Sequence, residues 1–216
     1  MMHRTIPGLV LVSSLALGCT KVPDAPAAQS SEAHASTTGA APSAPSAAAE
    51  TLPLDPAASR VEFTGAKITA THEGGFRDVR GTITLDPANL LASRIEVRVA
   101  TASLFIDNPR LQTHLTTPDF FDVARFPEAT FRSTAIVAGG AGGATHTITG
   151  DLTIHGQTKS LSFPITVEVS PTAVHATSTT QINRRDFGIV YPGMPDDLIR
   201  DEVNLRIDLR APRTPR

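Results

Sequence analysis

The sequence is poor in the residues that most often fill or cross-link a small domain. Its 216 residues include no tryptophan, one tyrosine and one cysteine. A single cysteine cannot form a disulfide within the chain, so any folded part must be held together by its own apolar core. The formal net charge of −2 shows no basic excess, which argues against nucleic acid as a partner.

Residues 1–18 have the pattern of a bacterial signal peptide. Arg4 precedes an apolar run from Ile6 to Leu17, which is shorter than the about 20 residues that span a bilayer. The stretch ending at Cys19 resembles a bacterial lipobox, with Ala16 where leucine is usual. We therefore expect lipidation at Cys19 and a place on the periplasmic face of the outer membrane of a Gram-negative-type bacterium. The alternative is an ordinary signal peptide in which Cys19 is incidental.

Residues 19–51 read as a tether between this anchor and a folded domain. From Thr20 to Glu50 the chain has no aromatic residue and is dominated by alanine, serine and proline. Such a composition cannot bury enough apolar surface to offset the entropy of ordering. The sequence predicts a disordered tether that shares no core with the domain.

Residues 52–213 are predicted to form one all-β domain. Apolar residues alternate with polar ones in eight runs, the pattern of half-buried strands. In the first run the phase slips at Gly65, which indicates a bulge or a bend, and turns are expected at Glu73-Gly74-Gly75 and His155-Gly156. The eight runs begin at the following apolar residues: Val61, Val79, Ile95, Phe131, Ile148, Leu161, Val174 and Val203.

Eight two-faced strands favour a closed antiparallel barrel, with a β-sandwich as the alternative. One segment, residues 111–126, lacks the alternation. Its Thr117-Pro118-Asp119 stretch predicts a helix start, and Phe120 and Phe121 would then line or plug a barrel mouth, or pack beneath the helix. Small inward residues would leave room for a ligand, whereas the alternative is a barrel packed solid. These small residues are Gly81, Ser133, Ala135, Gly150 and Ala176.

Four separated motifs resemble the YceI-like family of periplasmic proteins. They are His114-Leu115-Thr116-Thr117-Pro118-Asp119-Phe120-Phe121-Asp122 with the following Phe131-Arg132-Ser133, Gly150-Asp151-Leu152-Thr153-Ile154-His155-Gly156-Gln157-Thr158-Lys159, Asn183-Arg184-Arg185-Asp186-Phe187-Gly188, and Asp201-Glu202-Val203. The resemblance implies a lipocalin-like eight-stranded β-barrel that takes up a polyisoprenoid or another long-chain lipid, such as an isoprenoid quinone. It implies a carrier or sequestering protein that needs no cofactor, and it leaves a homodimer open.

Thirteen residues are candidates for lining such a ligand, because they lie on the inward phases of the strands or on the interrupting segment. They are Phe63, Val79, Ile83, Val97, Phe120, Phe121, Phe131, Ala135, Leu152, Phe163, Ile165, Leu205 and Ile207.

No pattern in the sequence predicts a catalytic or a metal site. His114 and Asp119 make only half of a metal site and more simply brace the helical turn. Arg184, Arg185 and Asp186 read as a charged surface turn, although the arginines would suit an anionic head group. Two other functions stay open, an enzyme acting on a lipid or quinone and a structural module of the envelope with no ligand.

Overall fold

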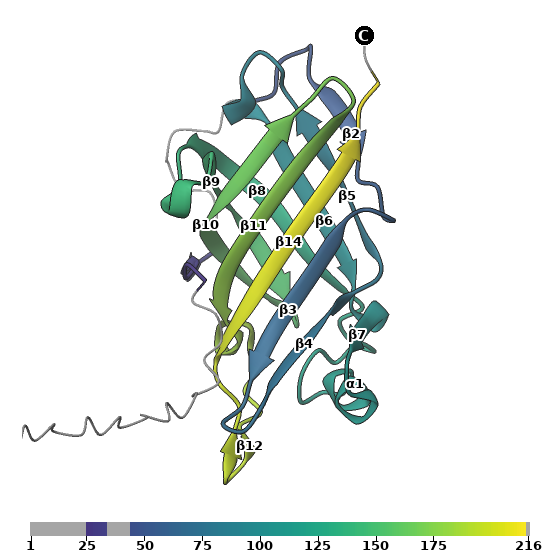
Figure 1. Ribbon diagram of the computed structural model, residues 1–216, viewed down its shortest axis with the longest axis vertical. Coiled ribbons are helices and arrows are strands. Elements are labelled where there is room, and N and C mark those ends of the chain that lie inside the picture. Colours follow the sequence, from purple (N-terminus) through teal and green to yellow (C-terminus); the bar gives the residue numbers. More distant parts are fainter. Residues whose placement is uncertain (1–24, 34–43, 215–216) are drawn as a thin grey trace, which may run out of the picture.

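The structure is a computed structural model that describes residues 25–33 and 44–214 (Figure 1). Twelve strands form one antiparallel sheet in the order β2-β5-β6-β8-β9-β10-β11-β14-β3-β4-β7, with β1 paired to β10. Their bounds are β1 (Gln29–Glu32), β2 (Glu50–Pro53), β3 (Arg60–Ala66), β4 (Thr71–Phe76), β5 (Val79–Leu85), β6 (Arg94–Ala100), β7 (Leu104–Ile106), β8 (Glu128–Ala138), β9 (His146–Ile154), β10 (Gln157–Val169), β11 (Ala173–Asn183) and β14 (Glu202–Pro212). A separate hairpin joins β12 (Gly193–Met194) to β13 (Asp197–Leu198).

The sheet curls around one interior, with its strands running diagonally along the long axis (Figure 1). The edge strand β2 comes close to β14, which lies inside the sheet between β11 and β3: Asp55, just after β2, donates its N–H to the carbonyl of Arg210 on β14 at 2.7 Å. All eight predicted strands are present, as β3, β5, β6, β8, β9, β10, β11 and β14. The predicted antiparallel barrel is therefore confirmed, with a sheet of twelve strands rather than eight.

The expected turn at Glu73-Gly74-Gly75 is wrong, because these residues lie inside β4. Gly74 pairs with Phe63 on one side and with Ile106 on the other. A Cβ atom at Gly74 would lie 2.6 Å from the carbonyl oxygen of Phe105. The glycines therefore allow neighbouring strands to approach closely, which is another common reason for glycine inside a β-strand.

The bulge is also not where the sequence placed it. Gly65 pairs regularly with His72, so β3 has no bulge there. The register shifts instead between Ser133 and Ala135 of β8, whose partners are the consecutive residues Gly150 and Thr149. Beyond this shift Ile136 is buried and Val137 is 53% exposed, so the inward phase of β8 has moved by one residue.

The helix lies earlier in the chain than predicted. Helix α1 spans Pro109–Leu115, and the Asn108 side chain accepts hydrogen bonds from the backbone N–H groups of Arg110 and Leu111. Asparagine as the N-cap followed by proline at the first helical position is a strong helix start. The predicted start at Thr117 is wrong, since residues 117–126 form a series of turns. The predicted turn at His155-Gly156 is confirmed: it joins β9 to β10, with φ of 49° and 73° at the two residues.

Part of the expected tether is ordered against the barrel. Strand β1 pairs with residues 159–162 of β10, although the sequence predicted disorder throughout residues 19–51. Ala28 donates its N–H to the carbonyl of Gln181 at 2.8 Å, and Gln181 donates to the carbonyl of Pro26 at 3.0 Å. β10 and β11 pair only from Thr166 and Thr177 to their shared turn. Residues 26–32 therefore fill the gap where these two strands separate, and disorder is wrong for this segment.

The signal peptide and Cys19 lie outside the described residues, so the expected lipidation stays a prediction. Within residues 25–33 and 44–214, no helix is both long enough and apolar enough to cross a bilayer.

Candidate ligand-binding cavity

The barrel encloses a cavity of about 500 Å³. This volume falls within the about 300–1,000 Å³ that is typical of small-molecule pockets. Side chains from β3, β4, β6, β8, β9, β10, β11, β14 and α1 all contribute to its wall. The alternative of a barrel packed solid does not describe this interior.

Ten of the thirteen candidate residues lie on the cavity wall, but Val79, Ile83 and Ala135 do not. Val79 and Ile83 are buried in the part of the core that packs beside the cavity. Ala135 was expected on the wall, which is wrong because the β8 bulge precedes it. The ten residues on the wall are Phe63, Val97, Phe120, Phe121, Phe131, Leu152, Phe163, Ile165, Leu205 and Ile207.

Several wall residues are only partly buried, although they are apolar and point into the barrel. Phe63, Leu152 and Leu205 are of this kind, and each packs against the buried core from the cavity side. Apolar surface that faces an internal space remains available to an apolar ligand. The wall therefore presents apolar surface to a ligand rather than hydrogen-bonding groups.

The open space does not come from the glycines that the sequence pointed to. A Cβ atom at Gly150 would lie 2.5 Å from the ring of Phe131, so that ring already fills the place of the missing side chain. At Gly81 a Cβ atom would meet the carbonyl oxygen of Glu96 at 2.0 Å. Gly65 differs, because it lines the cavity and a Cβ atom there would meet nothing within 4 Å.

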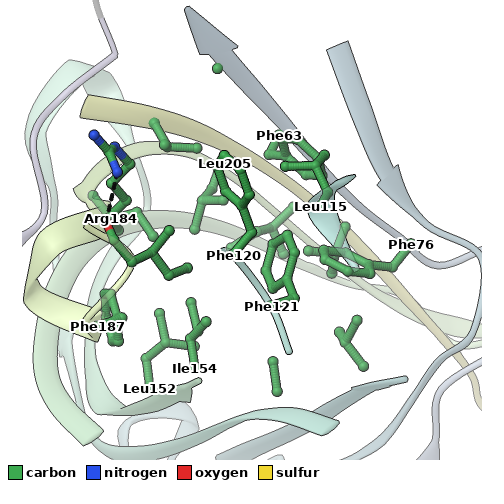
Figure 2. A pocket seen from close by; sticks show the side chains of 18 of the residues that line it. Phe63, Phe76, Leu115, Phe120, Phe121, Leu152, Ile154, Arg184, Phe187 and Leu205 are labelled. Carbon is green, nitrogen blue, oxygen red and sulfur yellow. Dashed lines mark hydrogen bonds between the residues drawn. The ribbon is translucent and has the colours of Figure 1, made fainter. Parts of the chain in front are cut away.

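Phe120 and Phe121 lie at the mouth of the cavity, one in each of two aromatic groups. The Phe121 ring packs edge-on against Phe76, with 5.5 Å between ring centroids, and Phe63 lies 5.9 Å from Phe76. Phe120 lies 5.5 Å from the Tyr191 ring. Figure 2 shows Phe120 and Phe121 between Arg184 on one side of the cavity and Phe76 on the other. The turns after α1 thus bring both rings over the mouth.

His114 joins the second aromatic group and braces the segment that carries it. Its Nε2 lies 2.8 Å from a carboxylate oxygen of Asp119, and its ring packs edge-on against Phe120 and Tyr191 at 5.0 and 4.9 Å. The last turn of α1 and the Phe120 segment are therefore tied together by the histidine. Across residues 25–33 and 44–214, no three His, Cys, Asp or Glu side chains gather closely enough to hold a metal ion.

Arg184 is buried beside the mouth, whereas the sequence predicted a surface turn. Its side chain is 5% exposed, and it donates to the carbonyls of Ile189 at 2.7 Å and Arg200 at 3.0 Å. It also forms an ion pair with Asp201 at 2.9 Å, so the expected charged turn on the surface is wrong for Arg184. Burial lowers the pKa of Arg184, and the Asp201 carboxylate opposes this effect.

The alternation along β11 already indicates that Arg184 is buried. Every second residue of β11 from Val174 to Ile182 is buried, and Arg184 continues this phase by one step. The guanidinium closes the inward face of the strand at the point where η4 (Arg184–Phe187) begins. Its hydrogen bonds fix the chain between residues 189 and 201 to the barrel.

Charged side chains at the rim are of both signs. Arg110, Arg200 and Lys67 line the mouth, and Lys67 forms an ion pair with Asp197. The hydrogen bond from Lys67, followed by those from Thr69, holds the pKa of Asp197 below its ordinary value. The polar groups are therefore gathered at the opening, while the deeper wall is apolar.

Relatives of the chain include UPF0312 proteins of Pseudomonas species. It is 40% identical over 128 residues to a UPF0312 protein of Pseudomonas syringae pv. tomato, a match that covers 56% of this chain and 65% of that protein, just under two thirds of its length. It is 39% identical over 138 residues to a UPF0312 protein of Pseudomonas putida strain W619, covering 61% of this chain and 71% of the relative.

Solved structures share the fold. BcnA of Burkholderia cenocepacia matches with a TM-score of 0.65 and 26% identity, over 73% of this chain and 99% of BcnA. A polyisoprenoid binding domain from Saccharophagus degradans, implicated in plant cell wall breakdown, matches with a TM-score of 0.60 over 74% of this chain and 97% of that domain, at 15% identity. The family model of the YceI-like domain matches residues 53–211, so this chain belongs to the YceI-like family.

Proposed function

We propose that this protein binds one long apolar lipid, of the polyisoprenoid or isoprenoid-quinone type, inside the barrel. The observation that carries this proposal is the apolar cavity of about 500 Å³. Each Å² of apolar ligand surface removed from water contributes roughly 25 cal/mol, so hydrocarbon is the material that this wall binds best.

The shape of the cavity supports a chain rather than a compact ligand. Val203, Leu205, Ile207 and Leu209 of β14 all line it. At about 3.3 Å per residue along a strand, this run corresponds to roughly 20 Å of cavity wall. At 15% identity, the likeness to the polyisoprenoid binding domain of Saccharophagus degradans shows a shared fold. This shared fold supports the same class of ligand here.

The proposal includes a place in the cell and a role. The barrel is held by a lipid at Cys19 on the periplasmic face of the outer membrane, and it carries or sequesters its lipid there without a cofactor. Support comes from the sequence of residues 1–19 and from the apolar cavity.

The test is to block the cavity at the glycine that leaves it open. Gly65→Phe places a ring where a Cβ meets nothing, and phenylalanine suits a strand better than glycine does. We expect native mass spectrometry of protein purified from the envelope to show at least a tenfold loss of bound lipid. The delipidated variant should lose less than about 1 kcal/mol of unfolding free energy, because the ring enters open space.

Thr64→Phe is the matched control, since Thr64 is the neighbouring residue of β3 and does not line the cavity. It should retain wild-type lipid content. The proposal is wrong if wild-type protein carries no lipid, or if Gly65→Phe carries as much as the control.

A further inference from the structure

Large apolar side chains are exposed at the end of the barrel where the cavity opens. Seven such side chains are exposed among the residues that the structure describes, and four belong to the β3–β4 turn and to the segment between η4 and β14. We call these four the apolar tip: Ile68, 59% exposed; Val190, 57%; Met194, 61%; and Leu198, 47%.

Hydrogen bonds and one ion pair hold the tip in place. Ile68 donates its N–H to the carbonyl of Leu198 at 3.1 Å. Thr69 donates both its N–H and its hydroxyl to Asp197, at 3.1 and 3.0 Å, and Lys67 pairs with the same carboxylate. Figure 1 shows the β12 hairpin projecting beyond the end of the barrel, close to the turn between β3 and β4. The exposed side chains are thus presented on an anchored projection.

The hairpin cannot cover both of its apolar side chains by packing against the barrel. Met194 pairs with Asp197 and Gly193 pairs with Leu198, so Met194 and Leu198 lie on opposite faces of the ribbon. Packing one face down would leave the other in water. A surrounding apolar medium covers both faces at once.

The apolar tip is continuous with the mouth of the cavity. Lys67, Ile189 and Ile199 line the cavity, and each is followed or preceded in the chain by a residue of the tip. A lipid that leaves the cavity at this end therefore passes the tip. This continuity favours a lipid surface as the occupant over a protein.

The N-terminal chain joins the barrel at the same end. Gln181, which bonds to Pro26 and Ala28, lies two residues before the end of β11, where η4 begins. The apolar run Ile6 to Leu17 and Cys19 precede this point in the sequence. The part of the sequence that is directed to a membrane is therefore attached near the mouth rather than at the far end of the barrel.

We propose that the apolar tip docks the mouth of the barrel onto a phospholipid bilayer, so that lipid exchanges between bilayer and cavity without crossing water. The transfer step rests on the proposed function, whereas docking itself does not. Interfacial binding of this kind scales with buried apolar area. Acidic residues, including Asp119 and Asp196, lie at the same end of the barrel as the basic side chains of the rim. Because the two signs of charge offset each other, docking does not depend on anionic lipid head groups.

Vesicle flotation tests the docking. The chain from residue 19 onward, with Cys19→Ser so that no acyl chain contributes, is floated with phosphatidylcholine vesicles. We expect Met194→Asp combined with Leu198→Asp to reduce the floating fraction at least fivefold. Val137→Asp combined with Val169→Asp is the matched control, because both side chains are exposed, at 53% and 38%, on strand ends away from the mouth.

A second measurement separates docking from lipid binding. The tip variant should load lipid from detergent micelles as wild-type protein does, since its cavity is unchanged, and its denaturation midpoint should match that of the control. Docking is overturned if the tip variant floats like the control, if wild-type protein does not float, or if the tip instead captures a protein and no vesicle. Flotation of a protein that never loads lipid would overturn the proposed function and leave docking in place.

Discussion

Two neighbouring arginines share one carboxylate but lie in different surroundings. Arg184 and Arg185 both contact the same oxygen of Asp201, at 2.9 and 2.7 Å. The Arg184 side chain is 5% exposed and that of Arg185 is 50% exposed. The buried guanidinium also satisfies backbone carbonyls of the rim, which water cannot reach as easily. The ion pair with Asp201 should therefore contribute more to the free energy of unfolding at Arg184 than at Arg185.

We predict that Arg184→Met lowers the unfolding free energy by about 3 kcal/mol, because it leaves buried carbonyls and a part-buried carboxylate without their partner. Arg185→Met, the matched control, should cost less than about 1 kcal/mol, as for an exposed ion pair. Urea denaturation of both variants measures the difference. Equal losses would mean that burial of Arg184 adds nothing to its contribution.

Single residues were also where the sequence misled most. Alternation along β8 predicted Ala135 on the cavity wall, yet one extra residue at the bulge reverses the phase beyond it. Likewise the small residues Gly81 and Gly150 suggested open space, although neighbouring atoms occupy it. An alternating pattern in the sequence does not show where a strand contains an extra residue. It also does not show where a ring from another strand fills the space beside a glycine.

At the scale of elements, long strands were predictable and short ones were not. The eight long strands alternate over enough residues for the pattern to be read, and all were found. β4 was hidden by Gly74 and Gly75, and β7, with three residues, is too short for any period. β1 is a polar Gln-Ser-Ser-Glu segment whose residues are all exposed, so only the open edge of β10 makes it a strand.

The contribution of β1 to stability can be measured by comparing chains that begin at Ala25 and at Ala44. The longer chain keeps the hydrogen bonds of residues 26–32 with Gln181 and β10. At about 0.5–1.5 kcal/mol net for each hydrogen bond, less the entropy of ordering, we predict that the shorter chain is about 1–2 kcal/mol less stable in urea. A difference below about 0.5 kcal/mol would support the flexible tether that the sequence predicts.

At the scale of the whole molecule, the sequence predicts the class of fold but not the shape and position of the cavity. The cavity depends on which rings fill which gaps across strands that are distant in the sequence, as Phe131 does at Gly150. Ten candidate residues nevertheless line it, because inward phase alone places them there. Membrane attachment through Cys19 stays a prediction from the sequence, since Cys19 lies outside the described residues.

We predict that Cys19→Ser in the full chain blocks acylation and either leaves the precursor uncleaved or releases the protein from the outer membrane. Each buried methylene contributes about 0.8 kcal/mol, so loss of the acyl chains removes the main anchor. Labelled palmitate and membrane fractionation report the two effects. Ser14→Ala, within the expected signal peptide, should leave both unchanged; equal palmitate incorporation into the Cys19→Ser variant would contradict the anchor.

The pairing of β1 with β10 also sets how much chain lies between the barrel and the anchor proposed at Cys19. A flexible chain from Cys19 to Glu50, 32 residues long, would have a root-mean-square reach of roughly 30 Å. With residues 26–32 held in the barrel wall, only the seven residues from Cys19 to Ala25 remain, and their six Cα–Cα steps span at most about 21 Å. With the acyl anchor that we propose at Cys19, a segment this short would keep the mouth within a bilayer's thickness of the anchor, and release of β1 alone would let the barrel move farther away.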